Sequence, residues 1–222
     1  MSIADYSDLA VTVSEYTGRD DFMQMFPRFV SFAENKLNRV LRVGNMEAVE
    51  TITTGSNGHY NLDNLPEPAN PRYSGASVFL EMRMVTDTTG RVLEALAPQA
   101  ANSRYGPYSG TPVAYYIKDS TFITTPYAAA TDFEINYYQR IPPISADTSY
   151  KSNWLLNSSP MIYLYAVSVE VMSWALASGK EPDPQRLALF RAALKEETDA
   201  LQAQDSNERY SNSKVMSRGV NP

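Results

Sequence analysis

Glu170 is the residue whose surroundings suggest chemistry most directly, because it is the only charged residue between Lys151 and Lys180. It lies in the apolar run from Met161 to Ala177. Burial raises the pKa of a carboxyl group, so a buried Glu170 could act as a general acid. The sequence spacing brings no second carboxylate or nucleophile to it, as acid–base catalysis requires. We therefore favour an ion pair between Glu170 and a cation on another helix or another subunit, and predict no catalytic residue.

The other candidate groups are also better explained without catalysis, a metal or a cofactor. His59 is the only histidine and lies beside a predicted turn, and the chain has no cysteine, so one chain cannot build a zinc site from several imidazoles or thiolates. Asp20-Asp21 and Glu196-Glu197 are adjacent pairs, whose side chains point in different directions on a helix. The glycines that could suggest phosphate loops lack the strand–glycine–helix context, and they are Gly55, Gly58, Gly106 and Gly110.

Tyrosine is unusually abundant in the second half of the chain, including Tyr115, Tyr116, Tyr137, Tyr138, Tyr163 and Tyr165. Large amphipathic rings suit protein interfaces, but they also suit platforms on which single-stranded nucleic acid stacks. A formal net charge of −6 does not supply the basic groove that such stacking needs. We favour interfaces and strand packing for these tyrosines.

The elements that position these residues follow the order helices, strands, helices. Apolar residues recur at helical spacing from Ile3 to Val13 and again from Phe26 to Leu41, with Gly18 as a stop and Asp20 or Asp21 as the expected cap between them. Pro27 either kinks the second helix or marks its first turn. Residues 47–140 then have the alternation and turns of strands.

Three turns are predicted in this strand region. Gly55-Ser56-Asn57-Gly58 predicts a hairpin between residues 49–54 and 59–62, and Asp119-Ser120 predicts a second one. Thr88-Thr89-Gly90 turns the strand of residues 77–86. A further strand is expected at 132–139 and a short helix at 98–104, whereas Pro66, Pro68 and Pro71 exclude a central strand around them.

Helix returns after Asn153, with Ser158 or Ser159 as a cap before Pro160, and a last helix starts at Asp183-Pro184. The long apolar run carries Glu170 and two serines, so a buried core helix is favoured over a membrane span. We predict an α+β fold in which residues 1–46 and 153–205 form one helical bundle. Residues 47–152 form an inserted antiparallel β module, and residues 206–222 form an extended C-terminal arm.

Several stretches, taken in order, resemble the head-to-tail adaptor family of tailed bacteriophages. The series covers about residues 20–200, and its packing patterns include Phe29–Arg42, Met46–Thr54, Tyr60-Asn61-Leu62, Phe79–Arg83, Gly110–Ile117, Phe133–Pro142 and Asn153–Tyr165. The proline-rich stretch Asp63–Arg72 is longer than the usual link of that family, and the last dozen residues match no part of it.

The resemblance implies a structural protein of the virion neck, made in the cytoplasm of the bacterial host. Such adaptors form a ring, usually of twelve copies, which joins the portal protein to a tail or nozzle protein while double-stranded DNA passes through the central channel. It implies no active site, cofactor or membrane anchor. The residues that we expect at protein interfaces are Tyr163, Tyr165, Glu170, Met172, Trp174, Arg209, Lys214 and Arg218.

Two alternatives remain open at the level of sequence. A tail-associated glycan hydrolase would need two carboxylates across a cleft, and the sequence gives no reason to pair any two of them. A protein-interaction domain of a non-viral protein would share the same composition, and only its partners would distinguish it.

Overall fold

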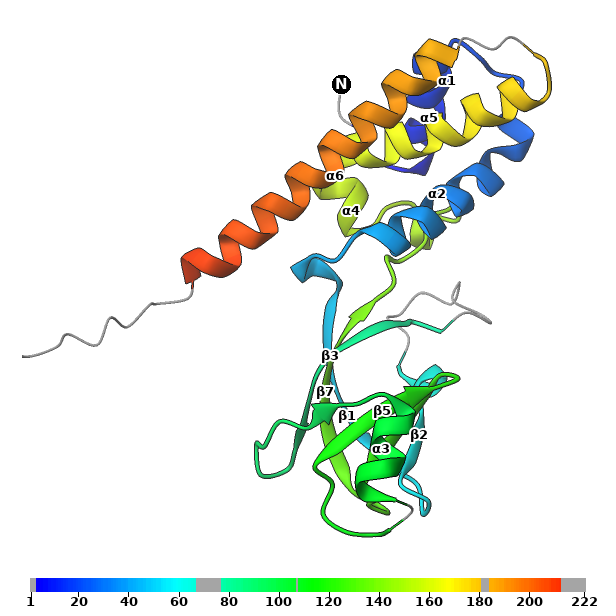
Figure 1. The fold of residues 1–222 in the computed structure, drawn as a ribbon. Helices are drawn as coiled ribbons and strands as arrows, with labels where there is room; N and C mark the ends of the chain where they lie inside the picture. The colour runs from blue at the N-terminus through cyan, green and yellow to red at the C-terminus, as the bar shows by residue number, and fades with distance from the viewer. Residues whose placement is uncertain (1–2, 67–76, 107, 181–183, 213–222) are drawn as a thin grey trace, which may run out of the picture. The chain divides into compact units, whose positions relative to one another are not determined.

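The computed structural model describes residues 3–66, 77–106, 108–180 and 184–212. It divides into two compact units, one of residues 1–45 and 143–222 and the other of residues 46–142. The first is helical and the second is mostly strand (Figure 1). The predicted α+β class is therefore confirmed.

The helices of the first unit are α1 (Tyr6–Thr17), α2 (Phe26–Val40), α4 (Trp154–Ser158), α5 (Pro160–Ala177) and α6 (Pro184–Asn212). The second unit holds β1 (Glu47–Thr53), β2 (His59–Asn61), β3 (Phe79–Asp87), β4 (Glu94–Ala95), α3 (Pro98–Tyr105), β5 (Ala114–Lys118), β6 (Thr121–Thr125) and β7 (Asp132–Gln139). Short 3₁₀ turns occur at Met23–Met25, Gly44–Met46, Leu62–Asn64 and Thr148–Tyr150.

Helix α5 is the centre of the helical unit, because α1, α2, α4 and α6 all pack against it. This arrangement explains why α5 is apolar on nearly every side: its neighbours are helices of its own chain. Ring contacts reinforce the packing, with Phe29 of α2 lying 5.8 Å from Trp174 of α5 between ring centroids. Tyr165 of α5 similarly lies 6.3 Å from Phe190 of α6.

Local sequence signals set several helix ends. Asp5 caps α1 by accepting the backbone N–H groups of Ser7 and Asp8, and Gly18 ends α1 with φ +63°. Pro27 lies in the first turn of α2, where its missing N–H costs no hydrogen bond, so the first-turn alternative is confirmed. The predicted cap of α2 is wrong, because Asp21 bonds Arg19 and Lys180 instead.

Two sheets form the second unit, with strand orders β1-β7-β3 and β2-β6-β5-β4. Their inner faces share one apolar core, in which the rings of Phe122 and Phe133 meet edge to face at 5.8 Å. The three-stranded sheet is antiparallel throughout. The second sheet is mixed rather than antiparallel, because the short β4 runs parallel to β5.

The turn at Gly55–Gly58 does not form the predicted hairpin. β1 pairs with β7 and β2 pairs with β6, so the chain crosses from one sheet to the other at this point. A tight turn can join two strands of one hairpin or two strands of different sheets. Here the pairing of β1 and β2 with distant strands decides for different sheets. Gly58 has φ +72°, and a Cβ there would lie 2.8 Å from the Cβ of Tyr127, so the turn requires glycine.

Other predicted elements agree with the structure. The hairpin at Asp119-Ser120 is confirmed, since β5 and β6 pair across it and both residues have positive φ. The strand at β7 and the short helix α3 are also confirmed.

The end of α6 differs from the prediction. Helix α6 continues past residue 205 to Asn212, which lies inside the segment predicted as an arm. The predicted cap Asp183 and most of the proline-rich stretch lie outside the described residues.

Candidate functional site

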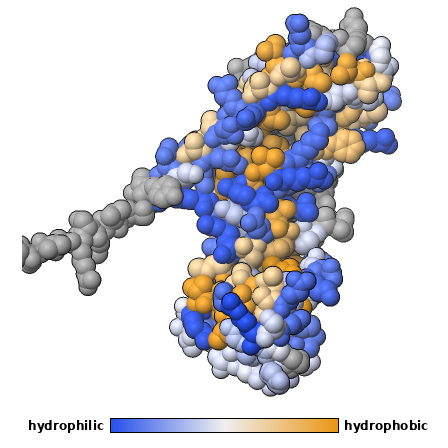
Figure 2. Space-filling view, in the orientation of Figure 1, coloured by the Kyte–Doolittle hydropathy of each residue, from blue (hydrophilic) through white to orange (hydrophobic). Residues whose placement is uncertain are grey.

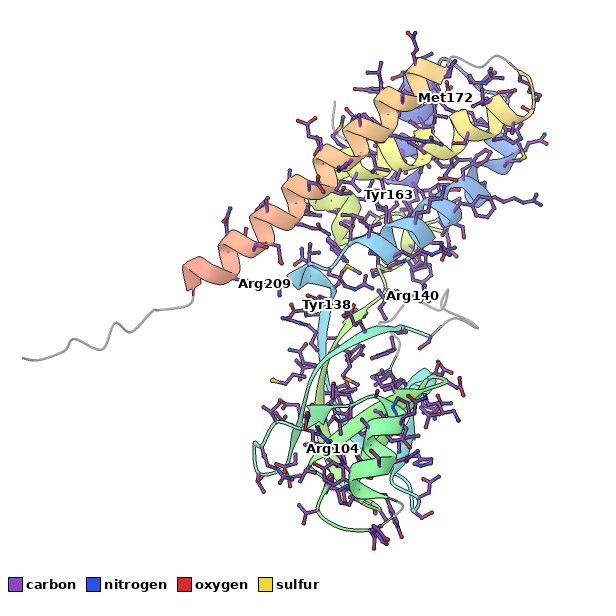
Figure 3. The ribbon with its side chains drawn as sticks, viewed as in Figure 1. Arg104, Tyr138, Arg140, Tyr163, Met172 and Arg209 are labelled. Carbon is purple, nitrogen blue, oxygen red and sulfur yellow. The ribbon has the colours of Figure 1, made fainter. Side chains whose placement is uncertain are left out.

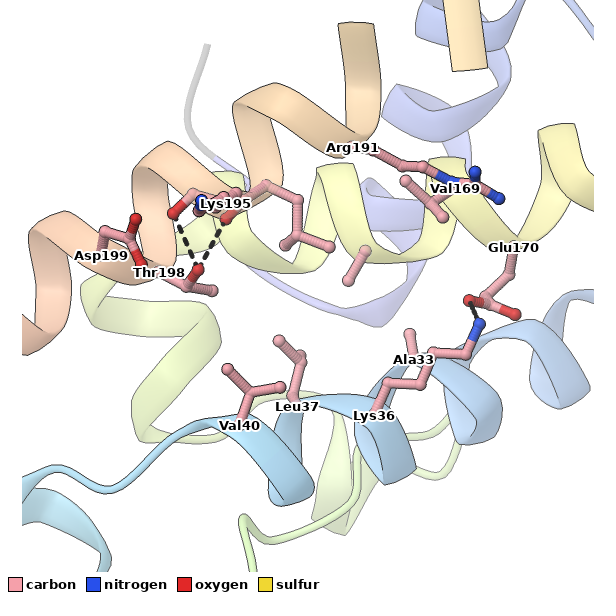
Figure 4. A pocket seen from close by; sticks show the side chains of 12 residues that line it. Ala33, Lys36, Leu37, Val40, Val169, Glu170, Arg191, Lys195, Thr198 and Asp199 are labelled. Carbon is pink, nitrogen blue, oxygen red and sulfur yellow. Dashed lines mark hydrogen bonds and ion pairs between the residues drawn. The ribbon is translucent and has the colours of Figure 1, made fainter. Parts of the chain in front are cut away.

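A groove of about 340 Å³ lies on the helical unit among α2, α5 and α6. Its walls are α2 and α6, which both pack on α5, and the close-up in Figure 4 shows side chains from all three helices around it. The apolar lining consists of Ala33, Leu37, Val40, Ala166, Val169 and Leu194. The polar lining consists of Lys36, Glu170, Arg191, Lys195, Thr198 and Asp199.

Glu170 and Lys36 join two sides of this groove. The Lys36 Nζ lies 2.5 Å from the Glu170 Oε1, and the Glu170 side chain is 10% exposed against 62% for Lys36. The predicted ion pair between Glu170 and a cation on another helix is therefore confirmed, within one chain. Because one partner is largely exposed, we assign the pair to orientation of the groove rim rather than to stability.

Charged groups of α6 form the opposite rim. Arg191 and Lys195 are exposed and one helical turn apart, and neither has an ion pair among the described residues. The hydroxyl of Thr198 donates to the backbone carbonyls of Leu194 and Lys195. The groove thus combines an apolar floor with a charged rim, on whose α6 side Arg191 and Lys195 stand with the single acid Asp199. Such a surface suits a helix or an extended segment from another protein.

Exposed hydrophobic side chains extend from the groove along the helical unit, and Figure 2 shows hydrophobic and hydrophilic side chains interspersed on the visible face. On α2, Val40 is 59% exposed and Phe32 is 52% exposed, and Lys36 lies between them at helical spacing. This stripe borders the groove. It enlarges the apolar surface that a partner could cover.

The residues of α5 that the sequence assigned to interfaces fall into three groups: buried, half-buried and groove-lining. Tyr163 is fully buried and Met172 is 5% exposed, so both side chains belong to the interior of the helical unit (Figure 3). Tyr165 and Trp174 are half-buried against α6 and α2 respectively. Among these α5 residues, Glu170 lines the groove.

Tyr163 belongs to a buried polar network that the sequence reasoning missed. Its hydroxyl donates to the Glu34 Oε1 at 3.1 Å and accepts from the Asn153 Nδ2 at 2.7 Å. The same Glu34 oxygen accepts the backbone N–H of Ile144, and the Asn153 Oδ1 caps α4 through the N–H of Leu156. The signal in the sequence was Glu34 beside buried positions of an amphipathic helix, where a carboxylate needs partners.

Arg209 lies near the C-terminal end of α6, where it forms an ion pair of 2.7 Å with Asp205 (Figure 3). Asp205 also accepts the backbone N–H of Gly44 at 2.6 Å. These contacts fasten the end of α6 to the segment that follows α2. Lys214 and Arg218, the other basic residues assigned to interfaces, lie outside the described residues.

A depression in the β unit is lined by carboxylates, but the surroundings of Asp87 do not suit a glycosidase acid. Asp87, Asp132 and Glu134 line a depression of about 400 Å³. The hydroxyl of Thr89, together with backbone N–H groups and Arg91, holds the pKa of Asp87 below its ordinary value. A general acid needs the opposite shift. Asp132 accepts the hydroxyl of Thr53 at 2.6 Å.

The structure also describes the surroundings of His59, the possible metal ligands and the apolar helix α5. His59 is half-buried on β2, where it pairs with Ile123. Within the described ranges, no group of three or more histidine and carboxylate side chains could hold a metal ion. Helix α5 has the length and composition of a membrane span, but 56% of that window is buried inside the chain, as in a core helix.

A comparison with known protein families matches nearly the whole chain. A family model described as SU10 adaptor protein matches residues 4–218. Among the curated proteins, none matches this sequence. The family match covers both units, including the groove and the buried network around Tyr163.

Proposed function

From the membership of this chain in the SU10 adaptor protein family, a family of phage head-to-tail adaptors, we propose that its copies form a ring between the portal and the tail. The chain is a structural adaptor of the virion neck. We expect the ring to hold twelve copies, to bind the portal protein on one side and a tail or nozzle protein on the other, and to surround the DNA channel. The family match over nearly the whole chain is the observation that carries this proposal.

The physical features of the molecule support a binding role. Its groove has an apolar floor, and two cations on its rim, Arg191 and Lys195, form no ion pair among the described residues. This is the kind of surface expected where helices of another protein dock. The formal net charge of −6 disfavours a lasting hold on nucleic-acid phosphates, so double-stranded DNA could pass without being retained. Asp87 carries a lowered pKa, which gives no support to the glycan hydrolase alternative.

We propose the C-terminal arm as an element that binds the portal. Lys214 and Arg218 give the last ten residues a local positive charge in a chain that is otherwise acidic. Opposite charge across an interface speeds encounter and fixes orientation more than it raises affinity. Because α6 continues to Asn212, the arm available to a partner begins after that residue.

The test uses the full chain, purified portal rings, and a variant that ends at Asn212. We expect the full chain to cosediment with portal rings, and electron microscopy to show added density on one face of the portal. Native mass spectrometry then counts the copies. The shortened variant should bind the portal more weakly but keep its helical content by circular dichroism. A chain that stays monomeric beside its portal, or that cleaves cell-wall or capsule glycans, would contradict the proposal.

A further inference from the structure

Helix α1 has a narrow face that is exposed among the described residues. Val11, at 54% exposed, lies at its centre, and Asp8 and Glu15 lie three and four residues away on the same side. Ser7 and Ser14 flank the opposite side of Val11 and are small enough to let another helix approach closely. The face therefore combines one apolar side chain with two acids.

Neither acid on this face, Asp8 or Glu15, forms an ion pair among the described residues. The Asp8 carboxylate accepts the backbone N–H of Ala4, and the Asp8 backbone carbonyl accepts the Thr12 hydroxyl. Glu15 lies in the last turn of α1, where the helix dipole disfavours a negative charge. A cation from another molecule would offset this unfavourable placement.

The groove of the helical unit offers the complementary features. Arg191 and Lys195 lie on the α6 rim, and Leu37, Val40 and Leu194 supply apolar surface. Helix α1 contributes no residue to the groove lining. The acidic face of α1 and the groove, whose charged lining holds three cations and two acids, are therefore two different patches of one chain. Two different patches are the requirement for a head-to-tail contact that closes into a ring.

We propose that the exposed face of α1 in one copy docks into the groove among α2, α5 and α6 of the next copy. Val11 enters the apolar floor beside Val40, and Asp8 and Glu15 face Arg191 and Lys195. This inference rests on the proposed function, because it supplies the contact that joins neighbouring copies in the ring.

The absence of cysteine allows a direct test by disulfide cross-linking. Single variants Val11→Cys and Val40→Cys are mixed on portal rings and oxidised. Two cysteines join only when their Cα atoms come within about 7 Å, so a dimer of the two variants reports docking between copies. The control replaces Val40→Cys by Val92→Cys, which alters a valine of similar exposure in the β unit. We expect the control mixture of Val11→Cys and Val92→Cys to form almost no cross-linked dimer.

Charge reversal gives a second test that does not depend on oxidation. The variants D8K/E15K and R191E/K195E each bring like charges together in every interface, so each alone should lose about tenfold or more of its assembly on portal rings. Mixed together, the two variants can alternate around the ring with opposite charges at every contact, and assembly should return. The control D63K/E134K makes the same charge change on exposed residues of the β unit and should assemble normally.

The outcomes separate this inference from the proposed function. Cross-linking of Val11→Cys to Val40→Cys together with rescue in the mixture supports the docking. Rings that form on the portal without this cross-link, and tolerate both charge reversals, overturn the docking and leave the ring in place. A cross-link from Val40→Cys to Val215→Cys would assign the groove to the C-terminal arm and also overturn the docking. No self-association on portal rings overturns both proposals.

Discussion

At the scale of single residues, the buried network around Tyr163 shows how polar groups fix the position of apolar helices. Apolar packing alone allows α5 to slide or rotate, because hydrophobic contacts are not directional. The hydrogen bonds from Tyr163 to Glu34 and from Asn153 to Tyr163 join α5, α2 and the start of α4 in one register. Each partner is buried, so a misplaced helix would leave polar groups without hydrogen bonds.

Removing the Tyr163 hydroxyl should therefore be costly. The variant Tyr163→Phe removes the hydroxyl that bonds both the Asn153 amide and the Glu34 carboxylate, and we expect a loss of about 1–3 kcal/mol in the free energy of unfolding. Urea titration followed by circular dichroism measures it. The matched control is Tyr165→Phe, since no hydrogen bond of the Tyr165 hydroxyl occurs among the described residues. Burial is the largest cause of the raised pKa of Tyr165, so this control also removes a hydroxyl from a partly buried ring. Equal losses in the two variants would contradict the role of the network.

At the scale of elements, the helix ends decide how α1 is presented. Asp5 and Gly18 set the two ends of α1 through a side-chain cap and a left-handed residue. Within those limits, Leu9 and Val13 face the interior and Val11 faces outward. The orientation of the proposed docking face thus follows from the cap and from helical periodicity.

The cap of α1 also predicts a dependence on pH. The backbone N–H of Asp8 chiefly, with that of Ser7 and the charge of Lys151, holds the pKa of Asp5 below its ordinary value of 3.8. A lowered pKa in the folded state gives stability that is present above 3.8 and is lost as the pH falls through the lowered value. The variant Asp5→Asn keeps a capping side chain without a titrating group.

We expect the wild-type chain to lose more thermal stability than Asp5→Asn when the pH falls from about 5 to about 2. Scanning calorimetry at several pH values measures the difference between the two proteins, and the acids they share cancel in this comparison. Parallel pH profiles would show that the Asp5 charge contributes nothing to the folded state.

At the scale of the whole molecule, the β unit is inserted into the helical unit through two neighbouring strands. Glu47 at the start of β1 pairs with Tyr138 near the end of β7, so the chain enters and leaves the β unit at adjacent points. The β unit has its own apolar core between its two sheets. These features lead us to propose that the two units are separate folding domains.

Expression of residues 46–142 alone should give a folded protein with cooperative unfolding, because its core and both sheets are internal. The complementary chain joins residues 1–45 to residues 143–222 through a short glycine-serine linker and should keep its helical circular dichroism. Limited proteolysis and thermal unfolding measure both. If residues 46–142 fail to fold while the full chain does, the β unit depends on the rest of the molecule and the domain proposal fails.

The sequence by itself determined the features that depend on local periodicity and on turn chemistry. Helical spacing identified α1, α2, α5 and α6, and Asp119-Ser120 identified the β5–β6 hairpin, because both signals act between residues a few positions apart. The ordered packing patterns were sufficient to indicate the adaptor family. They were not sufficient to separate interior residues of α5 from exposed ones, since that helix is apolar on nearly every side.

Only the tertiary structure decided which distant segments meet. The turn at Gly55–Gly58 joins two sheets because β7 and β6 compete successfully for β1 and β2, and no local signal records that competition. The ion pair of Glu170 with Lys36 and the bond of Tyr163 to Glu34 span more than a hundred residues of sequence. The groove exists because α2 and α6 both pack on α5, a relation among three helices that no single segment of the sequence encodes.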